Sequence, residues 1–161
     1  MSSEAGQLFP NKGQGHSFYM EMALKQAASA FKQDEVPIGA VVIQGNAVVG
    51  RGYNQRETLK DPTAHAEMIA ITAAANTKGD WRLDDCILYV TKEPCPMCAQ
   101  AISFARIRRL YYGAFDPKGG GVEHGPAIFS QPICNHKPEI VSGVQESQSV
   151  VLLQNFFKNL R

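Results

Sequence analysis

The chain has 161 residues, of which 44% are hydrophobic, and its 16 Lys and Arg nearly balance its 15 Asp and Glu. This composition fits one globular domain with a buried core, and it excludes a strongly basic protein or a membrane span, because no apolar run reaches about 18 residues. With a polar first stretch and only 4 cysteines, we expect a cytoplasmic protein with a polar tail over residues 1–15 and a single domain over residues 16–161.

The first part of the domain is expected to form a helix followed by a β-hairpin. Apolar residues recur at helical spacing over residues 18–31, which gives this helix one buried face. Pro37 then breaks the helix. Two short β-branched runs follow, over residues 38–43 and 47–49, and the Gln-Gly-Asn tripeptide between them favours a turn.

An Ala-rich helix is expected to begin near Thr63, after a polar loop without periodicity over residues 51–62. Gly79 ends this helix region. The boundary near Thr63 places His65 and Glu67 in the first turn of the helix.

A strand and a further helix follow in the sequence. Residues 86–90 form a compact apolar strand, and the next helix is expected to start at Pro94 and to reach about Ala105. Proline suits the first helical position because the N–H that it lacks would have no partner there. Cys95 and Cys98 therefore lie on the opening turn of this helix.

The C-terminal part adds a strand over residues 110–115, a Gly-rich loop, a short strand over residues 139–141 and a closing helix. The apolar face of that helix is expected to consist of Val150, Leu153, Phe157 and Leu160. Strands that alternate with helices imply crossover connections and parallel pairing, while the hairpin adds antiparallel pairing. We predict an α/β fold with a mixed sheet and helices on its faces.

Three residues at two helix starts suggest a catalytic zinc site. Such a site needs three protein ligands and one open position for water, and His65, Cys95 and Cys98 supply an imidazole and two thiolates. The two cysteines are three residues apart, so both sulfurs lie on one helical turn, where the helix N-terminus helps to hold them as thiolates. Glu67, two residues after His65, is the candidate proton carrier.

Two other interpretations of these residues remain open. A lone C-x-x-C can be a redox dithiol, and a structural zinc would need a fourth ligand, for which His136, Cys86 or Cys134 are candidates. The combination of H-x-E with a later P-C-x-x-C is a known signature of zinc-dependent nucleobase deaminases and favours the catalytic interpretation. Otherwise Cys86 and Cys134 are expected to be buried thiols, and His16, His124 and His136 surface or packing residues.

Further segments resemble the bacterial tRNA-specific adenosine deaminases of the cytidine deaminase superfamily, and the likeness runs from about His16 to Arg161. These segments are Asn54 and residues 35–41, 61–67, 88–91, 93–95, 106–109, 113–119, 135–136 and 155–157. The resemblance implies a cytidine-deaminase-like three-layer α/β/α fold with a mixed sheet of about five strands. It also implies a homodimer with one Zn²⁺ per subunit, which converts adenosine to inosine at the wobble position in the anticodon stem-loop of a tRNA.

The resemblance also implies roles for particular residues. Asn54 would hydrogen-bond the target nucleoside, Asp116 and Lys118 would lie against the neighbouring nucleotides, and Phe156 would meet the anticodon loop. Exposed aromatic rings and buried amides suit the recognition of splayed-out bases. For three of these residues a structural role is the alternative: Asn54 shapes a turn, Asp116 caps the Asp-Pro turn, or Phe156 completes the core of the last helix.

In the implied mechanism, a zinc-activated water attacks C6 of a flipped adenine, and Glu67 carries a proton to N1 and then to the departing amine. Backbone groups at Ala66, Pro94 and Cys95 are expected to orient the base.

Two features stand apart from this resemblance. Lys92 occupies a position where an apolar residue such as Leu is expected in the family, and it could pair with a phosphate or with Glu93 if it faces the rim of the pocket. Residues 106–118 form a modest basic stretch with Arg106, Arg108 and Arg109. This stretch is expected to contact either RNA or a dimer partner.

Two rival functions remain at this point. The first is deamination of a free base or nucleoside, such as guanine or cytosine, because the zinc motif fixes the reaction and leaves the substrate open. The second is a non-catalytic RNA-binding protein with a structural zinc.

Overall fold

A computed structural model describes residues 16–160, so the predicted polar tail over residues 1–15 lies outside the described residues. Its elements are α2 (His16–Lys32), β1 (Gly39–Gln44), β2 (Ala47–Tyr53), α3 (Arg56–Leu59), α4 (Ala66–Lys78), β3 (Cys86–Lys92), α5 (Pro96–Ala105), β4 (Arg109–Ala114), η1 (Ile128–Ser130), β5 (Glu139–Val141) and α6 (Glu146–Asn159). Within residues 16–160, no helix is both long and apolar enough to cross a membrane.

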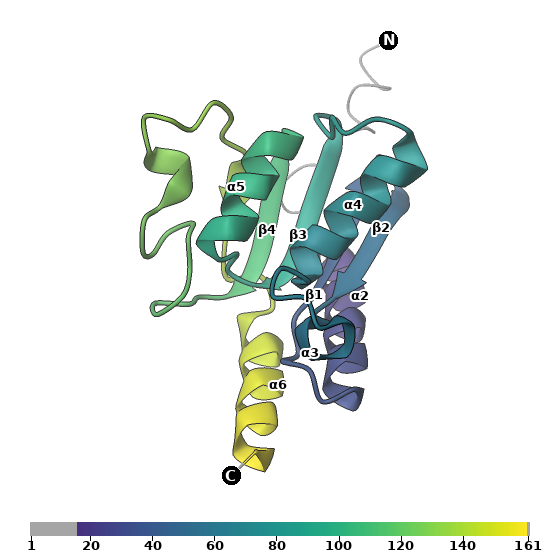
Figure 1. Ribbon diagram of the computed structural model, residues 1–161, viewed down its shortest axis with the longest axis vertical. Coiled ribbons are helices and arrows are strands. Elements are labelled where there is room, and N and C mark those ends of the chain that lie inside the picture. The colour runs from purple at the N-terminus through teal and green to yellow at the C-terminus, as the bar shows by residue number, and fades with distance from the viewer. Residues whose placement is uncertain (1–15, 161) are drawn as a thin grey trace.

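The strands form one five-stranded mixed sheet in the order β2-β1-β3-β4-β5 (Figure 1). Strand β1 pairs antiparallel with both β2 and β3, whereas β3, β4 and β5 run parallel to one another. The predicted mixed sheet of about five strands is therefore confirmed.

Helices cover both faces of this sheet, as the alternation of side chains along the strands requires. Val42 and Leu88 point to the face that α4 and α5 cover. Their neighbours Val41 and Tyr89 point to the opposite face, toward α2, where the Tyr89 and Tyr111 rings stack with their centroids 4.5 Å apart. The predicted α/β/α layering is confirmed, and α6 extends beyond the sheet at the lower end in Figure 1.

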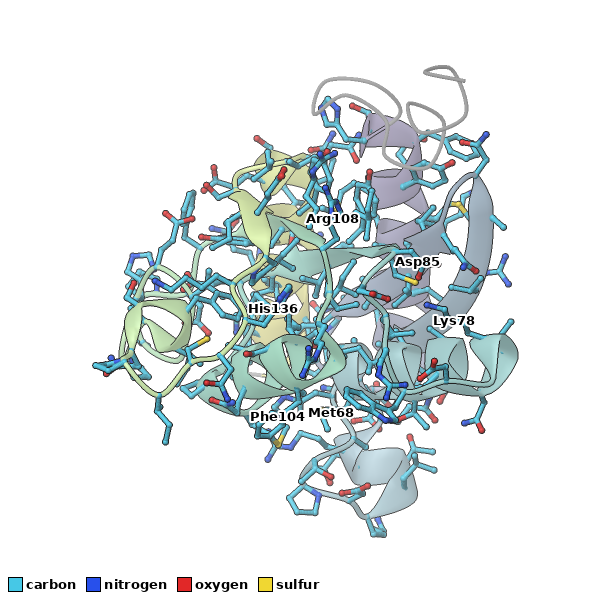
Figure 2. All side chains as sticks on the ribbon, turned by 90° about the horizontal axis from the view of Figure 1, so that it is seen from above. Met68, Lys78, Asp85, Phe104, Arg108 and His136 are labelled. Atoms are coloured by element: carbon cyan, nitrogen blue, oxygen red, sulfur yellow. The ribbon has the colours of Figure 1, made fainter. Side chains whose placement is uncertain are left out.

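A partly buried ion pair fixes the C-terminal end of α4. Lys78, the last residue of α4, lies 2.5 Å from Asp85, which directly precedes β3 (Figure 2). Asp85 also accepts a hydrogen bond from Gln44 at the end of β1, at 2.6 Å. These contacts tie α4 to two central strands, so the opposite end of the helix has a defined position relative to the sheet.

Three boundaries differ from the sequence-based prediction. The polar segment over residues 51–62 is not all loop, because β2 continues to Tyr53 and α3 follows it. Helix α4 begins at Ala66, with His65 as its N-cap. Helix α5 begins at Pro96 instead of Pro94, because Cys95 is the N-cap and its sulfur accepts the N–H of Cys98.

The predicted apolar face of the closing helix is wrong for two of its four residues, since Val150 and Leu153 are half-buried but Phe157 and Leu160 are not. Phe157 and Leu160 are 49% and 67% exposed, whereas Ser149 and Phe156 are buried. The Ser149 hydroxyl donates to the Thr91 carbonyl at 2.5 Å, which turns this side of α6 toward β3. Phe156 then packs edge-to-face on Phe31 of α2, so a polar contact decides which face of α6 is buried.

Candidate active site

The predicted zinc ligands meet at one end of the sheet. Strands β2 and β3 both run antiparallel to β1, so they end at the same edge, and α4 and α5 begin there. The two strands are not neighbours, as a simple crossover would make them, because β1 lies between them. His65 at the start of α4 nevertheless lies close to Cys95 and Cys98, with its Nδ1 atom 3.5 Å from each sulfur.

The spacing of these three ligand atoms fits a tetrahedral zinc ion. All three lie within 4.8 Å of one another. A nitrogen about 2.0 Å and a sulfur about 2.3 Å from a tetrahedral zinc are themselves about 3.5 Å apart, which matches the observed distance between His65 and each cysteine. One imidazole and two thiolates also leave one coordination position for water.

The environment of the cluster favours a thiolate at Cys95. A hydrogen bond from the Cys98 thiol, together with His65, lowers the pKa of Cys95 to about 4. The hydrogen bond between Cys98 and Cys95, together with burial, raises the pKa of Cys98. The hydrogen bond between His65 and Cys95 raises the pKa of His65. Cysteine binds a metal ion as the thiolate, so metal binding releases the proton of the Cys98 thiol.

Glu67 lies beside this cluster in the first turn of α4. Its side chain is 4% exposed and lines a cavity of about 200 Å³ together with His65 and Cys95. Burial raises the pKa of Glu67 above its usual value. A carboxyl group that takes up a proton more readily than an exposed glutamate suits proton transfer.

A glycine in β2 allows α4 to bring its first turn to this place. A Cβ atom at Gly52 would lie 2.5 Å from the carbonyl oxygen of Ala66 and 2.8 Å from the nitrogen of Ala70. Any side chain larger than hydrogen would therefore push the start of α4 away from the sheet. The position of His65 and Glu67 depends on this close contact between helix and strand.

The cavity collects some of the predicted substrate-binding residues and not others. Asn54, Ala66 and Asp116 are among the residues that line it. Lys118 is exposed and its N–H donates to the Asp116 carboxylate. The Pro94 carbonyl accepts the N–H of Gly121 at 2.8 Å, so it is used within the protein.

The predicted roles of Asn54 and Phe156 stay predictions. Asn54 is 5% exposed, its amide group donates to the Val36 carbonyl, and its oxygen accepts the N–H of Arg56, both at 3.3 Å. These contacts support a role in shaping the turn after β2. Phe156 is buried, and the aromatic residue of α6 that lines the cavity is its neighbour Phe157.

Lys92 and Arg56 also line the cavity, although sequence reasoning gave Arg56 no role and Lys92 no fixed partner. The Lys92 ammonium lies 2.9 Å from the Asp116 carboxylate and partly neutralises it at the rim. The only signal in the sequence was that Lys92 is a charged residue at the end of an apolar strand. Its partner is 24 residues away, too far for local spacing to identify.

The basic stretch does not line this cavity as a unit. Arg109 is 8% exposed and pairs with Glu139 at 3.0 Å. Arg106 is the C-cap of α5, at the opposite end of the helix from the cysteines, and its guanidinium carbon lies 5.8 Å from the centroid of the Trp81 ring. Phe104, near the same end of α5, is 69% exposed (Figure 2).

A fourth protein ligand is not found among residues 16–160, where the metal-ligating group around Cys95 contains only His65 and Cys98 besides it. Cys86 begins β3, the strand whose other end leads to Cys95. The Cys134 thiol donates to the His136 carbonyl, and the His136 ring lies 2.7 Å from the Ile107 carbonyl. Cys86, Cys134 and His136 therefore lie outside the group of His65, Cys95 and Cys98. This favours a zinc site whose fourth coordination position is open to water.

A buried carboxylate holds the short helix α3 beside the cavity. Glu35 is 1% exposed and accepts hydrogen bonds from the Thr58 hydroxyl and N–H and from the Glu57 N–H, at 2.7 to 3.1 Å. Burial raises its pKa, but the hydrogen bonds outweigh burial and the pKa lies below its usual value. Glu35 thus stabilises the segment that carries Arg56 at the cavity rim.

We expect Glu35→Gln to lower the free energy of unfolding by about 1–3 kcal/mol at pH 7, because buried donors lose a charged acceptor. A carboxyl with a lowered folded-state pKa stabilises the fold above its unfolded pKa, about 4.3, and this contribution is lost as the pH falls through the folded-state pKa. The difference between wild type and variant should therefore shrink below about pH 4. Urea unfolding at pH 7 and below about pH 4 measures this difference in the free energy of unfolding, and Glu57→Gln, at an exposed residue, is the control. A difference that does not depend on pH would contradict the role of the Glu35 charge.

The fold and the cluster are those of a nucleobase deaminase, and the family model of the MafB19-like deaminases matches residues 14–161. A tRNA-specific adenosine deaminase of Agrobacterium fabrum is 54% identical over 143 residues, which are 89% of this chain and 94% of that protein. The chain belongs to the family of tRNA-specific adenosine deaminases.

A solved structure supports this assignment, and a second one shares the fold. A structure from studies of A-to-I editing by tRNA:A34 deaminases at the wobble position of transfer RNA is 55% identical, with a TM-score of 0.83, and covers 85% of this chain and 99% of that chain. A guanine deaminase from Nitrosomonas europaea is 18% identical with a TM-score of 0.76, over 87% of this chain and 83% of that chain. The second likeness shows the fold alone.

Proposed function

We propose that this protein is a zinc-dependent enzyme that hydrolyses adenosine to inosine and ammonia at the wobble position of a tRNA anticodon. The observation that carries the proposal is the convergence of His65, Cys95 and Cys98 at zinc-binding distances beside the buried carboxyl group of Glu67. Membership of the tRNA-specific adenosine deaminase family supports the choice of substrate.

In this proposal His65, Cys95 and Cys98 hold one zinc ion per chain. When bound there, zinc supplies a Lewis acid that lowers the pKa of a water molecule toward neutrality. Glu67 would accept one proton from the attacking water at its carboxylate and deliver it to N1 of the adenine. It would then take the proton of the hydroxyl group added at C6 and give it to the amine, which leaves as ammonia while C6 becomes a carbonyl carbon. The same residue therefore acts as base and as acid.

The cavity walls select and orient the base. The cavity has a volume of about 200 Å³, which suits one nucleobase. The target base must therefore leave the stack of the RNA before it enters the cavity. The apolar side chains of Val36 and Ile38 line the cavity, and we assign the contacts with the nucleoside and its neighbours to Asn54 and Asp116. Lys118, exposed outside the cavity, is assigned to the flanking nucleotides.

The proposed partners are the anticodon stem-loop of a tRNA and a second copy of the chain in a homodimer. The proposed location is the cytoplasm, and the four free cysteines accord with a reducing compartment. The exposed apolar residues at the end of α5, such as Phe104, are available to a partner.

A substrate comparison tests the proposal. We expect the purified protein with bound zinc to release ammonia from a tRNA whose first anticodon nucleotide is adenosine, and to leave free guanine and cytidine unchanged. Conversion of a free base or nucleoside with the tRNA untouched would contradict the assignment, since a guanine deaminase shares the fold. No ammonia from any of these substrates would favour the non-catalytic alternative.

A further inference from the structure

We propose that Glu93 is a positioning residue that holds residues 116–124, the loop after β4, as one wall of the catalytic cavity. The proposal rests on the function proposed above, because it assigns to this loop a part in binding the substrate. It concerns a residue that lies between the zinc-ligand turn and the end of β3 without being a metal ligand itself.

The carboxylate of Glu93 is enclosed by donors from this loop. Its Oε1 atom accepts the N–H of Asp116 at 3.0 Å and lies 2.7 Å from Nδ1 of the His124 ring. Its Oε2 atom accepts three successive backbone N–H groups at 2.9 to 3.2 Å, those of Val122, Glu123 and His124. The residue is 3% exposed, so water does not replace these contacts.

One buried acceptor therefore joins both ends of a loop that contains three consecutive glycines and forms no helix or strand. A glycine-rich segment loses much conformational freedom when it is ordered. Hydrogen bonds to a charged acceptor are stronger than those between neutral groups, so a single carboxylate can order the segment.

The loop reaches the cavity through Asp116 and the zinc-ligand turn through Gly121. Asp116 lines the cavity, and Lys92, the neighbour of Glu93, holds its carboxylate at 2.9 Å. A Cβ atom at Gly121 would lie 2.5 Å from the nitrogen of Pro96, directly after the Cys95 ligand. Lys92 and Glu93 thus hold the loop over residues 116–124 as a cavity wall next to the turn that carries Cys95.

The charge of Glu93 matters more than its shape in this arrangement. In Glu93→Gln an NH₂ group replaces one of the two oxygens and faces at least one backbone N–H donor, whichever way the amide is turned. The side-chain size stays the same, so the substitution removes the charge and one acceptor oxygen without opening a void. The loop is then held less firmly next to β3, while the β3–β4 pairing remains.

A second substitution disturbs the same contact without changing Glu93. A Cβ atom at Gly120 would lie 2.5 Å from Oε2 of Glu93 and 2.6 Å from the Asp116 carbonyl oxygen. Gly120→Ala should therefore push the loop off the carboxylate. Glu21→Gln, an exposed glutamate on α2, is the matched control for the change of charge.

The test combines hydrogen exchange with steady-state kinetics on the zinc-loaded full chain, using an anticodon stem-loop RNA with adenosine at the wobble position. In Glu93→Gln and Gly120→Ala, the amide hydrogens of residues 116 and 122–124 should exchange at least about 10-fold faster, while those of β3 and α4 are unchanged. The KM for the RNA should rise about 10-fold or more, with a smaller change in kcat and the same zinc content. Glu21→Gln should match the wild type.

Different failures have different meanings. If wild type makes no inosine, the proposed function fails, and the exchange data still test whether Glu93 orders the loop. Unchanged exchange in both variants, or faster exchange with an unchanged KM, would overturn the positioning role. If Glu93→Gln does not fold, Gly120→Ala alone decides, by the same two readouts.

Discussion

Glu67→Gln is expected to lower kcat for tRNA deamination by about 10²–10⁴-fold, the range that general acid–base catalysis contributes. Glutamine fills the same space in the cavity but cannot carry a proton from water to the base. KM and the melting temperature should change little, and zinc should stay at one per chain, because Glu67 is not in the ligand group. Single-turnover kinetics on a stem-loop RNA and elemental analysis of the protein measure these quantities.

The exposed Glu146→Gln in the first turn of α6 is the control and should keep wild-type turnover. Turnover of Glu67→Gln within about threefold of wild type would rule out the proton shuttle, because loss of a general acid–base group costs far more. Loss of zinc from this variant would instead make Glu67 a ligand.

Cys98→Ala is expected to remove the bound zinc and to lower turnover at least about 10³-fold, because zinc contributes several kcal/mol of charge stabilisation. The substitution deletes one of the three proposed ligands, and the cluster contains no fourth candidate ligand within residues 16–160. A chelator should have the same effect on the wild type, and added zinc should reverse it.

The matched control is Cys134→Ala, which removes a half-buried thiol outside the ligand group. It should keep zinc and turnover. Zinc retained by Cys98→Ala would contradict the ligand set, whereas zinc lost from Cys134→Ala would favour a closed structural site. Circular dichroism of both variants separates loss of metal from loss of fold.

The ligand cluster could be predicted because short motifs at two helix starts encode it. His65 and Glu67 stand at the beginning of α4, and Cys95 and Cys98 at the beginning of α5, so local sequence fixes their helical positions. Local sequence does not show that the two helix starts meet, because the strands that lead to them are separated in the sheet by β1.

The cavity walls could not be predicted in the same way, because they depend on contacts between distant segments. Glu93 binds donors 23 to 31 residues further along the chain, and no periodicity records such a pairing. Helix α3 is four residues long and too short for a periodic signal, and it depends on the buried Glu35 carboxylate.

The closing helix shows where periodicity itself misleads. Apolar residues lie on more than one side of α6, and spacing alone pointed to the side that includes Phe157. The buried hydrogen bond from Ser149 to Thr91 shifts the buried face toward Ser149 and Phe156 and leaves Phe157 at the cavity. A polar contact therefore shifts the buried face of α6 away from the one that apolar spacing alone predicts.

The measurement that tests the central claim most directly is the position of inosine in an anticodon stem-loop RNA after incubation with the zinc-loaded protein. The RNA carries adenosine at the wobble position and at other loop positions, and reverse transcription reads inosine as guanosine. We expect conversion of the wobble adenosine alone, and none with Glu67→Gln. An RNA that stays unchanged with the wild type, or that is converted at other adenosines to the same extent, would contradict the account.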